Sequence, residues 1–269
     1  MKRSGIITLL TDFGLIDPYI AMMKGVILSI NIDARIVDIT HSINAGSIFQ
    51  AAHILAETFK YFPEGSIHVA VIDPGVGSNR KPIALETENH FFIGPDNGIF
   101  SLIIDKHAPS RIIEITEEKF FLPHVTKTFH GREVFAPVAA HVSMGTDIDH
   151  LGSPLNNPIK ISCPQPYQKD DILYGRIIRT DNFGNLITNI TNEDFDDFME
   201  RSRPEIHIGG IKLKELNDTY SDVKKGELLA LINSSGLLEI AVNLGRASDY
   251  PGIEAAETGE IVVKICKQE

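Results

Sequence analysis

Apolar residues in the first 150 positions fall into short runs and into longer stretches with helical spacing. Short β-branched runs predict strands, and stretches with an apolar residue every three or four positions predict helices. The expected strands are residues 6–10, 36–39, 67–72, 83–86, 90–93 and 111–115, and the expected helices are residues 18–29, 47–61 and 134–144. Because strands alternate with helices, we expect an α/β domain over residues 1–160 with a largely parallel central sheet.

The pattern changes near residue 160. Prolines at positions 154, 158, 164 and 166 punctuate a polar stretch that is typical of a linker. Beyond it, strand-like runs occupy residues 172–179, 185–190, 205–208, 228–232, 237–242 and 260–265. The helix expected at residues 191–201 begins with Thr191 and Asp194 at the spacing of a capping box. We therefore expect a small, mostly β domain over residues 170–269, built as a barrel or a sandwich.

Composition excludes several classes of protein. The 269 residues include 25 Lys plus Arg and 36 Asp plus Glu, a formal net charge of −11, which argues against a general nucleic-acid binder. No apolar run approaches the roughly 20 residues of a membrane span, and the start of the chain lacks the apolar core of a secretory signal. The two cysteines, Cys163 and Cys266, cannot form a disulfide framework. A reducing, cytoplasmic location is the expectation.

Two acidic segments follow expected strands. Asp12 comes directly after the first strand, and Asp73 begins the sequence DPGVG directly after the strand at residues 67–72. Ligands of parallel sheets collect beyond the carboxyl ends of the strands, although an Asp there also suits a turn. The segment lacks the Gly-Lys-Ser/Thr ending of a phosphate loop, so nucleotide phosphate binding is not expected. Arg80, seven residues after Asp73, suits an ion pair or a ligand contact equally.

Three further motifs combine polar and aromatic residues. TFHGRE places His130 just before a helix, and FIGPDNG contains a strong turn signal. In DNFGN, Phe183 can stack on a base and the amide of Asn185 can read an adenine edge, although a core aromatic beside a bulge fits as well. NSSG is either a plain hairpin turn or a loop that binds a carboxylate. No metal-ligand spacing is present, so no metal is expected. The sequence of a nucleophile elbow is absent as well.

Taken in order, six motifs resemble one family. TDFG, DPGVG with its Arg, FIGPDNG, TFHGRE, DNFGNLITNI and NSSGLLEIAVN resemble the S-adenosyl-L-methionine hydroxide adenosyltransferases, relatives of the S-adenosylmethionine-dependent fluorinase and chlorinase. The resemblance covers residues 6 to 265 and implies an α/β domain followed by a small β-barrel. It also implies a homotrimer with sites between the N-terminal domain of one subunit and the C-terminal domain of the next.

The resemblance implies a reaction as well. Water or hydroxide attacks the ribose C5′ of S-adenosylmethionine, and the products are adenosine and methionine. S-adenosylmethionine is then the substrate, and no cofactor is required. The sulfonium is already an excellent leaving group, so the protein needs chiefly to exclude bulk water and align one oxygen.

Residue by residue, the resemblance places the hydrolytic set on Asp73, Arg80 and His130. Arg80 would polarise the water, His130 would position it or take its proton, and Asp73 would orient Arg80. The substrate-binding positions implied by the same motifs are Asp12 for the ribose hydroxyls, Phe183 and Asn185 for adenine, Asp181 for the methionine ammonium, Ser234 for the methionine carboxylate, and Glu239 with the backbone of Val242 along the substrate. Ser235 stands where the halogenases have Arg.

Two alternatives to a hydrolase remain. A halogenase would carry Ser where this chain has Gly131 and Tyr where it has His130, and the spacing from Arg80 to Phe92 leaves no room for the inserted loop of the fluorinase. The other alternative is a nucleoside-binding sensor without turnover. The joint presence of Asp73, Arg80 and His130 argues against it, and a turnover assay separates the two.

Overall fold

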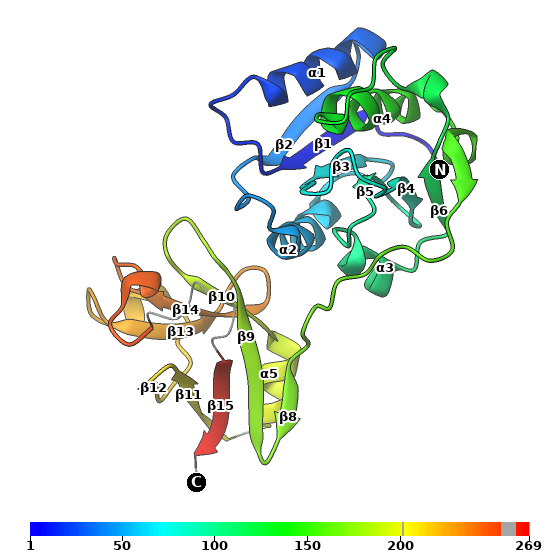
Figure 1. Cartoon of the computed structure of the whole chain (residues 1–269). Helices are drawn as coiled ribbons and strands as arrows, with labels where there is room; N and C mark the ends of the chain where they lie inside the picture. Colours follow the sequence, from blue (N-terminus) through cyan, green and yellow to red (C-terminus); the bar gives the residue numbers. More distant parts are fainter. Residues whose placement is uncertain (201, 254–261, 269) are drawn as a thin grey trace. The chain divides into compact units, whose positions relative to one another are not determined.

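The computed structural model describes residues 1–200, 202–253 and 262–268 (Figure 1). The chain divides into two compact units, Met1–Cys163 and Pro164–Glu269, each with its own sheet and hydrophobic core. The strands of the first unit are β1 (Ile6–Thr11), β2 (Arg35–Thr40), β3 (Ile67–Val71), β4 (Pro82–Glu86), β5 (Phe91–Pro95), β6 (Arg111–Ile115) and β7 (Gly152–Pro154). Its α-helices are α1 (Tyr19–Ile30), α2 (Ile48–Thr58), α3 (Ser101–His107) and α4 (Ala136–Ser143).

The sheet of the first unit is mixed, so the expectation of a largely parallel sheet was wrong. Its strand order is β2-β1-β3-β5-β4-β6-β7. The β1–β2, β1–β3 and β3–β5 pairs are parallel, whereas the β4–β5, β4–β6 and β6–β7 pairs are antiparallel. A parallel neighbour needs a crossover of a dozen or more residues. Only residues 87–90 join β4 to β5, so these two strands form a hairpin.

Helices cover both faces of this sheet (Figure 1). Alternate strand residues point to opposite faces, and they divide between two hydrophobic clusters. Ile7, Leu9, Val69 and Val71 pack with α1 and α4, whereas Leu10, Ala70 and Ile72 pack with α2 and α3. The first unit is therefore a three-layer α/β/α structure, and the carboxyl ends of β1 and β3 lie at one edge of its middle layer.

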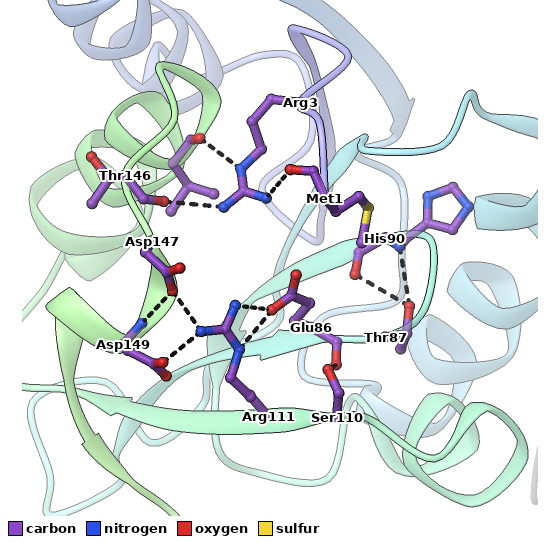
Figure 2. A network of polar contacts seen from close by, with 11 residues as sticks. Met1, Arg3, Glu86, Thr87, His90, Ser110, Arg111, Thr146, Asp147 and Asp149 are labelled. Atoms are coloured by element: carbon purple, nitrogen blue, oxygen red, sulfur yellow. Dashed lines mark hydrogen bonds and ion pairs between the residues drawn. The ribbon is translucent and has the colours of Figure 1, made fainter.

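A network of ion pairs ties strands β4 and β6 to the segment before β7 (Figure 2). Arg111 on β6 donates through Nε to the buried carboxylate of Glu86 on β4, at 2.7 Å, and its Nη2 contacts the same carboxylate oxygen. Its Nη1 donates to Asp147 and Asp149, each at 2.6 Å. Close by, Arg3 donates to the carbonyl oxygen of Thr146 at 3.2 Å. These contacts brace the antiparallel half of the sheet.

The second unit is almost entirely β-structure. Its strands are β8 (Tyr167–Lys169), β9 (Ile172–Thr180), β10 (Leu186–Thr191), β11 (Arg203–Ile208), β12 (Ile211–Leu213), β13 (Leu228–Ile232), β14 (Leu237–Val242) and β15 (Val262–Gln268). They form one antiparallel sheet in the order β12-β11-β15-β9-β10-β14-β13, with β8 beside β9. The two end strands, β12 and β13, also contact each other, so the sheet is nearly barrel-shaped.

Local signals identified most of these elements. The capping box expected at Thr191 is present at the start of α5 (Asn192–Met199), where Thr191 and Asp194 each accept the other's backbone N–H. Helix α3 and the short strands β7, β8 and β12 were not expected from the pattern. Of the strand expected at residues 260–265, positions 260 and 261 lie outside the described residues.

Candidate active site

Two carboxylates follow neighbouring parallel strands. Residues Thr11 of β1 and Val71 of β3 are register partners, so Asp12 and Asp73 both leave the sheet at the same edge. The Asp12 carboxylate accepts the backbone N–H of Gly46 at 2.8 Å, which fixes one of its oxygens. The strand positions thus deliver two acids to the end of the sheet where ligands of such folds bind.

Asp73, Arg80 and His130 form a continuous hydrogen-bonded chain. Arg80 donates through Nε to both carboxylate oxygens of Asp73, each at 2.9 Å, and its Nη2 also contacts Oδ2. The same Nη2 donates to Nδ1 of His130 at 2.7 Å. The Arg80 and Asp73 side chains are only 7% and 5% exposed, so this ion pair is nearly removed from water. Arg80 Nη1 is buried and makes no hydrogen bond to the described residues.

His130 is held in one protonation state. Burial lowers its pKa below the ordinary 6.5, and the charge of Arg80 lowers it further. Asp73, the backbone of Thr126 and Glu133 raise the pKa, but they do not offset the first two causes. The ring is therefore neutral at neutral pH. Since Arg80 has only donors to offer, Nδ1 must be the accepting nitrogen, and Nε2 carries the hydrogen.

The segments that carry these residues meet through close backbone contact. A Cβ on Gly77, in the loop between Asp73 and Arg80, would lie 2.3 Å from the carbonyl oxygen of Lys127, and Gly77 has φ +75°. Only glycine allows this approach and this conformation. The DPGVG loop is therefore packed directly on the segment that leads to His130.

A cavity of about 380 Å³ opens beside the chain of three residues. Asp73 and His130 lie in its wall with one cationic side chain, Arg132, and the hydroxyl residues Thr126 and Thr128. The rest of the wall is apolar or aromatic and consists of Phe13, Tyr19, Met22, Val71, Val76, Phe129 and Gly131. Such a mixture of apolar surface with a few convergent polar groups is typical of a small-molecule site.

Aromatic rings make up one side of the cavity. Phe13, Tyr19 and Phe129 meet edge to face, with ring centroids 5.2–5.9 Å apart. Gly131 lies directly against this cluster, because an added Cβ would come within 3.1 Å of the Phe129 ring and 3.3 Å of Met23 Sδ. A side chain at position 131 would therefore displace its neighbours.

The DNFGN motif forms a turn between β9 and β10. The Asp181 carboxylate accepts the backbone N–H groups of Phe183 and Asn185 at 2.9 and 2.8 Å, and the side-chain amide of Asn185 at 3.1 Å. Asn185 is buried, whereas the Phe183 ring is 73% exposed, which is unusual for a large aromatic residue. The turn presents this ring to its surroundings on a rigid base.

A buried carboxylate lies near this turn in the second unit. Glu239 on β14 accepts hydrogen bonds from the Tyr220 hydroxyl at 2.8 Å and from the Asn233 side chain at 3.1 Å. Burial raises its pKa, and the nearby charge of Asp181 adds to the rise. Burial and the Glu239 carboxylate raise the pKa of Tyr220 to about 12. Glu239 is therefore a buried, hydrogen-bonded carboxylate and does not face solvent.

NSSG is the hairpin turn between β13 and β14. Asn233 closes it by accepting the backbone N–H groups of Ser235 and Leu237 through its side chain, and Ser234 is exposed at its tip. Val242 is buried at the other end of β14. Within the second unit the structure brings Asp181, Asn185 and Glu239 near one another, while Ser234 lies in the turn before β14 and Val242 is the last residue of that strand.

Sequence reasoning missed several residues of the cavity wall. Thr126, Thr128, Phe129 and Arg132 line it, and Glu133 anchors two of them. Thr128, Phe129 and Arg132 lie inside the TFHGRE motif, so the motif could have indicated them. Only His130 and Gly131 of that motif were named as candidates from the sequence.

Comparisons with known proteins place the chain in a family. Residues 7–152 match the model of the SAM hydroxide adenosyltransferase N-terminal domain, and residues 175–259 match that of the C-terminal domain. The chain is 38% identical to the (R)-S-adenosyl-L-methionine hydrolase of Methanocaldococcus jannaschii (96% of this chain, 95% of that protein) and 34% identical to the protein of the same name from Thermus thermophilus (91% and 94%).

More distant relatives and a solved structure agree with this placement. A fluorinase from Actinoplanes is 26% identical over 88% of this chain and 91% of its own. The crystal structure of an uncharacterized conserved protein from Thermotoga maritima superposes with a TM-score of 0.89 at 33% identity, covering 97% of this chain and all of that one. The chain belongs to the SAM hydroxide adenosyltransferase family.

Proposed function

We propose that this protein hydrolyses S-adenosyl-L-methionine to adenosine and L-methionine. The observation that carries the proposal is the hydrogen-bonded set Asp73, Arg80 and His130, of which Asp73 and His130 line a cavity of about 380 Å³, in a protein whose relatives are named (R)-S-adenosyl-L-methionine hydrolase. The oxygen of water forms a bond to C5′ of the ribose, and the C5′–S bond breaks with its electron pair going to sulfur. The reaction consumes one water and releases one proton.

Arg80 and His130 are suited to hold the nucleophile as donors. With Nδ1 occupied by Arg80, His130 offers an N–H from Nε2, and Arg80 has Nη1 without a partner among the described residues. Two donors that converge on one oxygen stabilise hydroxide relative to water. His130 then positions and polarises the nucleophile, and the proton leaves to solvent.

The remaining assignments concern the substrate. Asp12, one oxygen of which is held by Gly46, is assigned to the ribose hydroxyls. The exposed Phe183 ring and Asn185 are assigned to adenine, and Asp181 to the ammonium group. Ser234, Glu239 and the backbone of Val242 are assigned to the methionine side. Because the relatives' names specify the (R) form, we propose that the configuration at sulfur matters here too.

S-adenosylmethionine is consumed as the substrate in this proposal, and neither a cofactor nor a metal takes part. In the part of the chain that the structure describes, no group of three or more His, Cys, Asp or Glu side chains is placed to hold a metal ion. The acidic character of the chain suits a cationic sulfonium ligand. None of the described helices is long and apolar enough to cross a bilayer.

We further propose a homotrimer in which the site lies between subunits, acting in the cytoplasm. The exposed Phe183 supports a shared site, since a large aromatic ring on a rigid turn needs a ligand or a neighbour to cover it. The two free cysteines fit a reducing compartment. Light scattering coupled to size exclusion measures the oligomer, and a monomeric active enzyme would contradict the shared site.

Incubation with each sulfonium epimer of S-adenosylmethionine, in ¹⁸O-labelled water, tests the function. The expected products are methionine and adenosine with the label in the 5′-hydroxyl, faster from the (R) epimer, with or without a chelator. Parallel reactions with chloride or fluoride test the halogenase alternative, which the crowding at Gly131 disfavours. Binding without any product would show a sensor and overturn the proposal.

A further inference from the structure

Glu133 is a buried carboxylate beside the cavity that the proposed chemistry does not use. Its side chain is 0% exposed and lies on a π-helical turn, η3 (Gly131–Phe135), immediately after His130. It accepts the backbone N–H of Thr126 at 2.6 Å and the Thr126 hydroxyl at 3.0 and 3.2 Å. Its remaining partner is the guanidinium of Arg132.

The groups that the Glu133 carboxylate binds among the described residues belong to the cavity wall. Thr126 and Arg132 line it, the Thr126 hydroxyl lies 3.2 Å from that of Thr128, and the Arg132 guanidinium lies 5.1 Å from the centre of the Phe129 ring. Burying a carboxylate is costly unless it is well paired. Here the pairing immobilises a segment, residues 126–128, that is otherwise exposed. π-Helical turns of this kind are frequent at functional sites.

Thr126 also lies beside His130. Its backbone and the Glu133 carboxylate both act on the imidazole in the direction that raises its pKa, against burial and Arg80. Glu133 therefore holds the segment of the cavity wall that adjoins His130.

We propose that Glu133 is a positioning residue for hydrolysis. By holding Thr126 and Arg132, it fixes the parts of the cavity wall that adjoin His130. It thereby keeps the nucleophile confined against the N–H of His130. This inference rests on the proposed function, since it gives His130 the role assigned there. The charged groups that face His130 are Arg80, Asp73 and Glu133.

Glu133→Gln and Thr126→Val test the inference against a matched control. Glu86→Gln is the control, because Glu86 is also buried and paired with an arginine but lies outside the cavity wall. We expect Glu133→Gln to lower kcat about tenfold or more with KM changed less than about threefold. Thr126→Val should lower kcat in the same direction, and the double variant should add little to Glu133→Gln. Glu86→Gln should lower the Tm and leave kcat unchanged.

A spectroscopic measurement separates this inference from the proposed function. ¹⁵N NMR of the histidine rings, assigned by loss of a signal in His130→Gln, should show hydrogen on Nε2 alone in the wild type. Glu133→Gln should keep this tautomer, which Arg80 imposes, and should lower the pKa of the His130 ring, because the Glu133 charge raises it; Glu86→Gln should leave that pKa unchanged. If the wild type hydrolyses nothing, the proposed function fails while this arm still decides the role of Glu133.

Three outcomes would overturn the positioning role. One is an unchanged pKa of His130 in Glu133→Gln, and another is a kcat that matches that of Glu86→Gln. The third outcome applies if the Glu133→Gln protein does not fold. Thr126 is exposed, so Thr126→Val then carries the test, and a normal kcat in that variant would refute the proposal.

Discussion

Arg80 Nη2 donates a hydrogen bond to His130 Nδ1 over 2.7 Å, and this contact decides which nitrogen of the imidazole carries hydrogen. A histidine in this arrangement is a donor toward the cavity and not a free base. The same guanidinium is clamped by Asp73, so the orientation of the ring depends on an ion pair that is nearly buried. The contact joins two motifs that lie 50 residues apart in the sequence.

Arg80→Ala and His130→Ala should each lower single-turnover hydrolysis by about a hundredfold or more, while substrate affinity stays nearly intact. Positioning and polarising one nucleophile contribute on this scale. Because both side chains act on the same oxygen, the double variant should lose less than the product of the two effects. His150→Ala, which changes an exposed histidine outside the cavity wall, is the control. A well-folded His130→Ala protein with normal turnover would remove His130 from the mechanism.

Hydrolysis should persist at mildly acidic pH and fail as His130 becomes protonated. Burial and Arg80 lower the pKa of His130 below 6.5, so the neutral ring is retained at pH 6.5 and is lost only in more acid solution. Arg80→Ala removes one of the causes, and the pKa should rise toward or above its ordinary value. An NMR titration of the His130 ring in both proteins measures the shift. An identical pKa in the two proteins would contradict the contact as the cause.

Asp12→Ala should weaken substrate binding more than it slows the chemical step. Loss of charge-assisted hydrogen bonds to the ribose costs on the order of 1.5–3 kcal/mol each, about ten- to a hundredfold in Kd per bond. Calorimetry in a His130→Ala background measures binding without consuming the substrate. Asp17→Ala, in the exposed part of the same loop, serves as the comparison. Equal affinity of the two variants would refute the ribose assignment.

The free energy of unfolding should fall between pH 7 and pH 5, in part because of His68. This ring is fully buried between the hydroxyl of Thr8 and the ring of His90, and burial lowers its pKa from 6.5 to about 3. The unfolded chain binds a proton below pH 6.5 whereas the folded chain does not until about pH 3. His68 therefore stabilises the fold above pH 6.5, and about 2 kcal/mol of this is lost by pH 5.

Denaturant titrations at the two pH values measure this loss. A His68→Gln variant should lose about 2 kcal/mol less than the wild type on going from pH 7 to pH 5. The exposed His124 provides the comparison variant, His124→Gln, which should behave as the wild type does. Equal slopes for the wild type and His68→Gln would show that His68 is not the responsible group.

Arg111→Met should destabilise the first unit by about 2 kcal/mol, because it leaves the Glu86 carboxylate buried without its partner. The pairing with Asp147 and Asp149 adds less, since those carboxylates are half exposed (Figure 2). Replacing Glu86 by Leu together with Arg111→Met should restore most of the loss. Chemical denaturation of both variants measures the difference, and a double variant as unstable as the single one would contradict the pairing.

Local patterning was enough to place most helices and strands. The period of apolar residues distinguishes helix from strand, and a cap such as Thr191 with Asp194 acts within one turn. The same patterning did not predict whether neighbouring strands run parallel or antiparallel, because this depends on which neighbour each strand pairs with. The four-residue connection between β4 and β5 excludes a crossover, and the length of that loop was the overlooked signal.

The active site likewise consists of residues that the sequence indicated and of contacts that only the folded chain creates. Asp73 and Arg80 are seven residues apart, so a short loop brings them together, and motif order alone indicated both residues and His130. The bond from Arg80 to His130, the tautomer it imposes and the hold of Glu133 on Thr126 exist only after folding. Side chains from separate segments meet because β1 and β3 pair in register and because Gly77 lets the backbone of Lys127 approach. Distances of this kind depend on packing across the sheet, which spacing along the chain does not contain.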